Sequence, residues 1–269
     1  MTGLQKALGA SQFFTIGFGA IIGVGWVVVL GEWLPQAGPL GAILAFVGGT
    51  ALISLVGLCY AEVGSLLPVS GGEMAYAYEA FGVKASYVTG WLLALMYTAT
   101  VSFEAIAAGW ILATLAPGIE GPALYGLGGE TLRLGTLGIG IGGTVLLAVI
   151  NYRGIRSSAK LQDVLTYGLI LVSLTFIAVG IVGGDASNLQ PLFQRSSGSI
   201  WPGVVAVLAT TPFWFGGFNT IPQLLEEKAS GTTLRSVGNV MLLSIWGAGA
   251  FYCLVILSAS MAAPWGETV

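Results

Sequence analysis

The chain has 269 residues, of which 55% are hydrophobic and only 8% are charged. A soluble domain usually carries about 25% charged residues, so this composition excludes a water-soluble globular protein. It predicts an integral membrane protein that crosses a plasma or inner membrane several times. It gives no reason to expect a nucleic-acid partner.

Histidine is absent, which removes the usual haem ligand and the most common zinc ligand. The two cysteines, Cys59 and Cys253, lie in apolar segments and are interpreted as small buried hydrophobic residues. No pattern of an intramembrane enzyme is present. We therefore expect no cofactor, no metal and no catalytic residue.

Seven segments are long and apolar enough to approach the roughly 20 residues of a membrane-spanning helix. They predict an all-α fold and lie at residues 12–34, 40–67, 86–115, 134–151, 161–183, 201–225 and 234–262. Lys and Arg are concentrated on one side of this topology, which predicts a cytoplasmic N-terminus. The inner set is Lys6, Lys84, Arg153, Arg156, Lys160, Lys228 and Arg235, and the outer set is Arg133 and Arg195.

The first span contains "GFGAIIGVGWVV" at residues 17–28, with four glycines within nine positions. One interpretation is close helix packing, because Gly19 and Gly23 form a small-xxx-small pair. The other is a helix broken in mid-membrane, whose exposed amide groups could hold an anion.

A second segment favours the broken helix. The stretch "TPFWFGGFNTIPQLLEE", residues 211–227, places two prolines and two glycines inside the sixth span. Interrupted first and sixth helices match two inverted five-helix repeats with a binding site at the bilayer midplane. We therefore assign residues 1–183 to a first repeat and residues 184–269 to part of a second.

These motifs resemble the amino acid–polyamine–organocation transporter superfamily. The resemblance extends to "AEVGSLLPVSGGEMAYAYEAFGVKASYVTGWLLALMY" at residues 61–97 and to "NYRGIRSSAKLQ" at residues 151–162. It implies secondary transport of amino acids by alternating access, through exchange or proton or sodium symport. Relatives have about ten core helices, so we expect a chain truncated after its seventh span.

The resemblance also implies a substrate site. Backbone groups around the first break would receive the substrate carboxylate, carbonyls near residues 215–217 would accept its ammonium group, and an aromatic side chain would cover it. The candidate residues are Ala20, Ile21, Ile22, Gly23, Val24, Gly25, Trp26, Trp214, Phe215, Gly216, Gly217, Phe218 and Asn219. Ordinary packing is the competing interpretation for each aromatic residue.

Glu104 is the one acidic residue well inside a predicted span. Buried carboxyl groups are costly unless protonated or paired. Glu104 is thus a candidate proton carrier or counter-charge for a cationic substrate, and the structural alternative is a hydrogen bond to a neighbouring helix. An amine or polyamine transporter, or an inactive fragment, is the alternative function.

Glu226 and Glu227 follow the sixth span on the predicted inner side. The family pattern suggests that they pair with Arg153 or Arg156 to form an inner gate. The competing interpretation is a solvated helix end, because exposed ion pairs contribute only about 0–1 kcal/mol.

Overall fold

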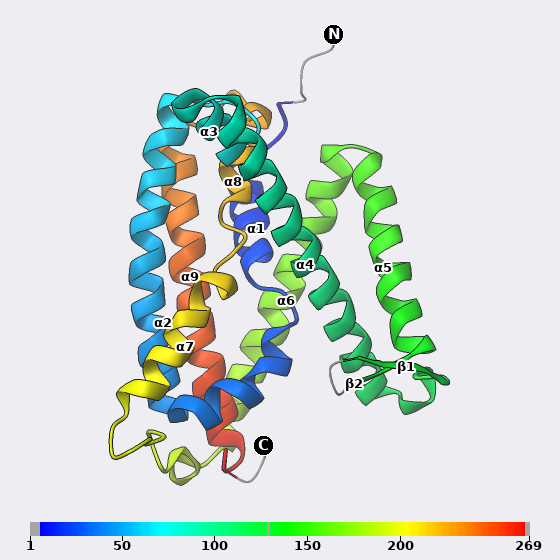
Figure 1. The fold of residues 1–269 in the computed structure, drawn as a ribbon, viewed down its shortest axis with the longest axis vertical. Helices are drawn as coiled ribbons and strands as arrows, with labels where there is room; N and C mark the ends of the chain where they lie inside the picture. Colours follow the sequence, from blue (N-terminus) through cyan, green and yellow to red (C-terminus); the bar gives the residue numbers. More distant parts are fainter. Residues whose placement is uncertain (1–5, 128–129, 267–269) are drawn as a thin grey trace. The chain divides into compact units, whose positions relative to one another are not determined.

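The computed structural model describes residues 6–127 and 130–266. The described part is mostly helical, which confirms the predicted all-α fold, and it includes one small hairpin (Figure 1). Its helices are α1 (Ala10–Ile21), α2 (Trp26–Leu66), α3 (Glu73–Phe81), α4 (Val83–Leu115), α5 (Leu134–Tyr152), α6 (Ile155–Gly183), α7 (Trp201–Trp214), α8 (Thr220–Gln223) and α9 (Leu234–Ala262). Short 3₁₀ turns cover Pro117–Ile119, Ala186–Leu189 and Leu225–Glu227.

Five helices in the described residues are long and apolar enough to cross a membrane, compared with the seven spans expected. The difference arises at the first and sixth spans. The first is divided between α1 and the beginning of α2, and the sixth is divided between α7 and α8. The last predicted span, by contrast, coincides with α9.

Helix α2 contains a kink where the sequence predicts a loop with two prolines. Gly38 has a φ of 72° and separates two helical stretches, and Pro39 follows it directly. Proline is tolerated in the first turn of a helix because its missing N–H needs no partner there. Ala37 O and Leu40 N–H, next to the kink, bond to Gln194 N–H and Leu192 O at 2.9 Å each.

The chain divides into two compact units. The first comprises the described parts of residues 1–22, 29–72 and 159–269, and the second comprises residues 23–28 and the described parts of 73–158. This division describes local packing. The assignment of residues 1–183 and 184–269 to two repeats stays a prediction.

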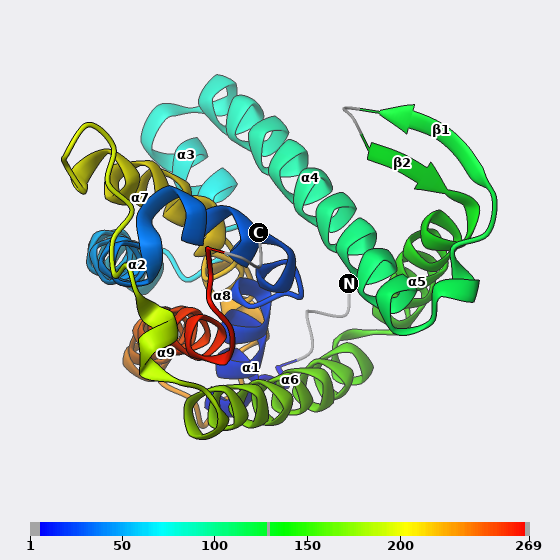
Figure 2. The same ribbon diagram turned by 90° about the horizontal axis from the view of Figure 1, so that it is seen from below.

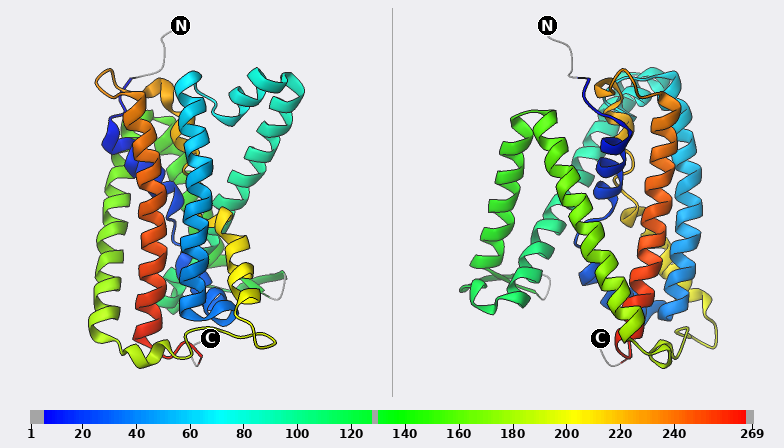
Figure 3. Two further views of the ribbon diagram at one scale, coloured as in Figure 1. Left: turned by 90° about the vertical axis from the view of Figure 1, so that its left-hand side faces the viewer. Right: turned by 180° about the vertical axis from the view of Figure 1, so that it is seen from behind.

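In the first unit, α2 and α9 run side by side (Figure 3), and α1 lies among α6, α8 and α9 (Figure 2). Small residues allow these helices to approach closely. A Cβ atom on Gly249 of α9 would lie 2.9 Å from the Thr50 methyl group of α2, and one on Gly49 would lie 2.7 Å from the Thr211 Cβ atom of α7. Gly49 and Gly249 are therefore used for close packing between helices.

Polar side chains join α1 to α6 in the same unit. Asp163 accepts hydrogen bonds from the Thr15 hydroxyl and, at 3.2 Å, from the Gln12 amide. Gln162 and Thr166 donate to the Thr15 carbonyl at 3.3 and 3.1 Å. These bonds hold the part of α1 that precedes Gly17 and Gly19 against α6.

The second unit contains α3, α4, α5 and an antiparallel hairpin of β1 (Ala123–Leu127) and β2 (Glu130–Arg133). Neither α3 nor the hairpin was predicted from the sequence. The hairpin segment is short and Gly-rich, and its strands are joined through residues 128–129, which lie outside the described residues. Arg133 pairs with Glu120 at 3.1 Å at its base.

We predict that Gly249→Ala lowers the free energy of unfolding by about 1–3 kcal/mol, because overpacking forces α2 and α9 apart. The matched control is Gly168→Ala in α6, where an added Cβ atom meets nothing within 4 Å. Alanine is the better helix former, so this control should be neutral or stabilising by up to about 1 kcal/mol. Thermal unfolding in detergent measures both. Equal effects of the two variants would contradict close packing at Gly249.

Candidate functional site

The first predicted span is interrupted as expected. Helix α1 ends at Ile21 and α2 begins at Trp26, and the C-cap residue Ile22 has an extended backbone. The residues between these helices include Gly23 and Gly25. This confirms a discontinuous first helix.

The sixth span is also interrupted. Helix α7 ends at Trp214 and α8 begins at Thr220, with turns between them. Gly217 has a φ of 124°, which a residue with a side chain rarely adopts. Its N–H donates to the Asn219 side chain at 3.2 Å, and its carbonyl accepts from Thr220 N–H and hydroxyl at 3.0 and 2.7 Å. The break is therefore held by its own local hydrogen bonds.

The end of α1 meets the break of the sixth span within the first unit. A Cβ atom on Gly217 would overlap the Ala20 carbonyl group and lie 2.8 Å from the Ile21 nitrogen. The backbone of the sixth span thus packs directly on the end of α1, which requires glycine at this position. The structure brings together Ala20, Ile21 and Gly217 of the predicted set.

Tyr252 of α9 lies at the same place and was missed by the sequence analysis. Its hydroxyl donates to the Trp214 carbonyl at 2.9 Å and lies 3.3 Å from the Ile21 carbonyl. The side chain is only 2% exposed. A tyrosine inside an apolar span needs a partner for its hydroxyl. This need is the feature of the sequence that could have identified Tyr252.

The predicted aromatic residues pack against protein. Phe215 is fully buried and its ring lies 5.8 Å from that of Tyr252, while the Phe218 ring meets Tyr60 edge to face at 5.5 Å. Trp214 is half-buried and packs on Trp33 at 5.2 Å. These contacts agree with the packing interpretation, and an aromatic gate stays a prediction.

Glu104 contacts the first break in the second unit. Its Oε2 atom accepts a hydrogen bond from the Val24 N–H at 2.8 Å. An added Cβ atom on Gly23 would overlap this carboxyl group, and one on Gly25 would lie 3.1 Å from Oε1. The glycines therefore make room for the acid. Trp26, next along the chain, is buried.

The predicted Glu–Arg pairs are not tested. Glu226 accepts from the Ser70 N–H at 2.9 Å, and the Glu227 carbonyl accepts from Ala7 and Leu8 N–H at 2.9 and 3.0 Å. Burial raises the pKa of the Glu227 carboxyl. Arg153 belongs to the second unit and the side chain of Arg156 lies outside the described residues, so the inner gate stays a prediction.

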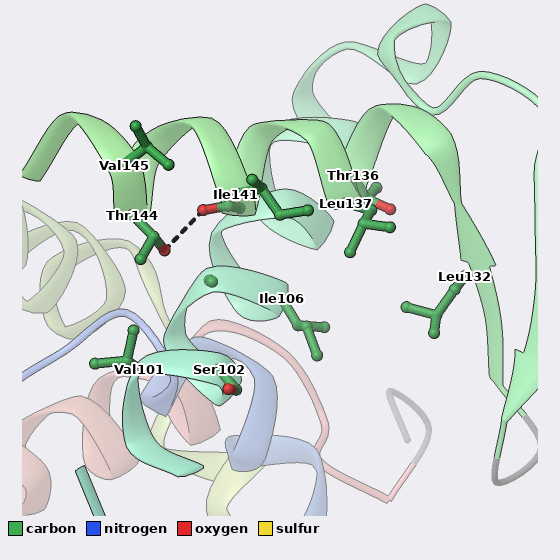
Figure 4. Close-up of a pocket in the computed structure, with 11 residues that line it drawn as sticks. Val101, Ser102, Ile106, Leu132, Thr136, Leu137, Ile141, Thr144 and Val145 are labelled. Atoms are coloured by element: carbon green, nitrogen blue, oxygen red, sulfur yellow. Dashed lines mark hydrogen bonds between the residues drawn. The ribbon is translucent and has the colours of Figure 1, made fainter. Parts of the chain in front are cut away.

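A pocket of about 290 Å³ lies between α4 and α5 (Figure 4). Its lining is apolar except for a few hydroxyl groups, and the Thr144 hydroxyl donates to the Gly140 carbonyl of its own helix. None of the predicted substrate-site residues lines this pocket. Its position on two membrane-length helices is typical of a surface that faces lipid.

Comparison with known proteins adds independent evidence. The branched-chain amino acid permease BcaP of Bacillus subtilis is 33% identical over 234 residues, which are 83% of this chain and 48% of that protein. The methylthioribose transporter of Bacillus subtilis is 27% identical over 258 residues, 90% of this chain and 52% of that protein. The amino-acid permease RocC of Bacillus subtilis is 28% identical over 267 residues, 94% of this chain and 53% of that protein.

The chain spans about half the length of these relatives. The family model of amino acid permeases matches residues 8–269, and both predicted helix breaks are present. The chain is a multi-pass membrane protein that belongs to the amino acid permease family.

Proposed function

We propose that the protein transports amino acids across a membrane by alternating access, with the substrate held at the two helix breaks. Membership of the permease family supports transport. The observation that carries the site is the contact of Gly217 with Ala20 and Ile21, because it places the ends of both broken helices together. Broken helices at a midplane site are the arrangement that secondary transporters use.

The chemistry of the two breaks suits a zwitterion. Residues 23–25 lie outside both α1 and α2, so amide groups of the first break can face a carboxylate.

 The carbonyls of residues 215–217 present partial negative charge to an ammonium group. Phe215 and Phe218 flank this position, where their rings pack against Tyr252 and Tyr60. An amino acid is thus the substrate class that the site supports best.

Glu104 adds a competing carboxylate. It bonds to the Val24 N–H, one of the groups proposed to receive the substrate carboxylate. Two anions cannot share one donor favourably, so substrate binding requires Glu104 to move or to take up a proton. This supports proton-coupled transport over exchange or sodium symport. A cationic amine that binds Glu104 directly is the second candidate function.

We also propose that the N-terminus lies in the cytoplasm. The support is the asymmetry of Lys and Arg along the chain, seven on one predicted side and two on the other. By the same argument, Glu226 and Glu227, which follow the sixth span, lie at the inner surface.

The transport proposal is tested with the product of the complete reading frame in proteoliposomes. We expect uptake or exchange of labelled neutral amino acids, and a stimulation of uptake by an inward proton gradient but not by a sodium gradient. Amines and methylthioribose serve as comparison substrates. A protein that moves none of the amino acids would contradict the proposed function, and preferential uptake of amines would favour the second candidate.

We expect Glu104→Gln to transport amino acids without proton stimulation, since an amide cannot take up the proton and is already neutral. Uptake under a proton gradient should fall to the level seen without one, while exchange persists. The control is Glu120→Gln, which alters an exposed acid paired with Arg133. If Glu104→Gln instead loses only cationic substrates, the acid acts as a counter-charge, and unchanged transport of every substrate would assign it a structural role.

We predict that Gly217→Ala abolishes substrate binding. Alanine at this backbone angle costs roughly 1–2 kcal/mol, and its methyl group would push the end of α1 away. Gly216→Ala is the control, because that residue has no positive φ and an added Cβ atom would contact only its own turn. Binding is measured by ligand-induced thermal stabilisation of the purified variants. Equal binding by the two variants would show that the contact with α1 is not needed.

A further inference from the structure

Two helices end inside apolar segments, and each end leaves carbonyl groups without a partner from its own helix. In the hydrocarbon region such groups are costly unless another protein group satisfies them. Ile21 O and Trp214 O are two of these carbonyls, at the ends of α1 and α7. Their partner therefore helps to determine where each helix stops.

Both carbonyls face the same hydroxyl group. Tyr252 Oη lies 2.9 Å from Trp214 O and 3.3 Å from Ile21 O. A phenol carries a single proton, so the two carbonyls share it, with the shorter bond to Trp214. One donor thus holds the ends of both broken helices.

The ring that carries this hydroxyl has little freedom. It lies 4.7 Å from the Phe46 ring and 5.9 Å from the Trp33 ring, both on α2, and 5.8 Å from the Phe215 ring. It projects from α9, which is continuous from Leu234 to Ala262. The hydroxyl is therefore carried by a continuous helix, and its ring is held in place by packing on α2.

We infer that Tyr252 is a positioning residue that ties the ends of the two broken helices to α9, so that both halves of the substrate site keep one spacing. This inference rests on the proposed function for its consequence in transport. This tie, the hydrogen bond from Tyr252 that the two carbonyls share, is a property of the fold. Because the proton is shared, a change at one break alters the bond available to the other.

The tie is tested with Tyr252→Phe in the complete protein. This variant keeps the ring and removes only the hydroxyl. Amide hydrogen exchange should become about threefold to tenfold faster in both break segments, residues 20–25 and 213–219, since one shared hydrogen bond is lost. Exchange along the rest of α2 and α9 should not change.

Transport gives the second readout. If the spacing of the two half-sites is disturbed, KM for the amino acid should rise by about threefold to tenfold while kcat stays within about twofold. Ser260→Ala is the matched control, because it removes a buried hydroxyl of the same helix that bonds to the Ile256 carbonyl of α9 at 2.7 Å. This control should leave both break segments unchanged.

A para-aminophenylalanine at position 252 restores a donor at the same place and should restore slow exchange in both segments. Faster exchange in only one segment, in neither, or along the whole of α9 would overturn the tie. A protein that transports no amino acid but shows the paired change in exchange would refute the proposed function and leave the tie standing. Normal KM together with unchanged exchange in Tyr252→Phe would refute the tie alone.

Discussion

The backbone of a membrane protein must satisfy its own hydrogen bonds, and this constraint governs both interruptions in the chain. At the sixth span, Asn219 and Thr220 bond to the backbone of Gly217. At the first span, Glu104 accepts from the Val24 N–H. Tyr252 donates to a carbonyl at the end of each broken helix. The breaks persist because side chains, some local and some from other segments, replace the missing helical bonds.

Glycine has two separate uses in this molecule. On continuous helices, residues such as Gly49 and Gly249 let neighbouring helices approach. At the breaks, Gly217 adopts a positive φ and lets one backbone lie against another, while Gly23 leaves space for the Glu104 carboxyl group. The break between α1 and α2 agrees with the broken-helix interpretation of residues 17–28, while Gly49 and Gly249 show glycine used for packing on other helices.

The position of Glu104 links the fold to the proposed chemistry. An acid in an apolar helix is costly, and here it is compensated by an amide of the first break. The Val24 N–H that bonds to Glu104 is one of the groups that the proposed substrate carboxylate also needs. The Glu104–Val24 contact is therefore one that substrate binding at the proposed site would disturb.

The class of protein, most of the helices and both interruptions could be predicted from the amino-acid sequence alone. Composition and apolar length are local properties, which is why α5 and α9 begin where expected. The clusters of Gly and Pro at residues 17–25 and 212–222 are also visible locally, because these residues weaken a helix wherever they occur. The family resemblance then supplied the interpretation of these breaks.

Which distant groups satisfy the breaks depends on tertiary packing. Tyr252 lies 231 residues from Ile21, and Glu104 lies 80 residues from Val24. No periodicity or spacing connects residues so far apart, since their contact depends on how whole helices pack. The kink of α2 at Gly38 also involves residues far along the chain, because Ala37 O and Leu40 N–H bond to Gln194 N–H and Leu192 O. Local sequence shows where the helix is weak, and the packing of distant helices decides what takes its place.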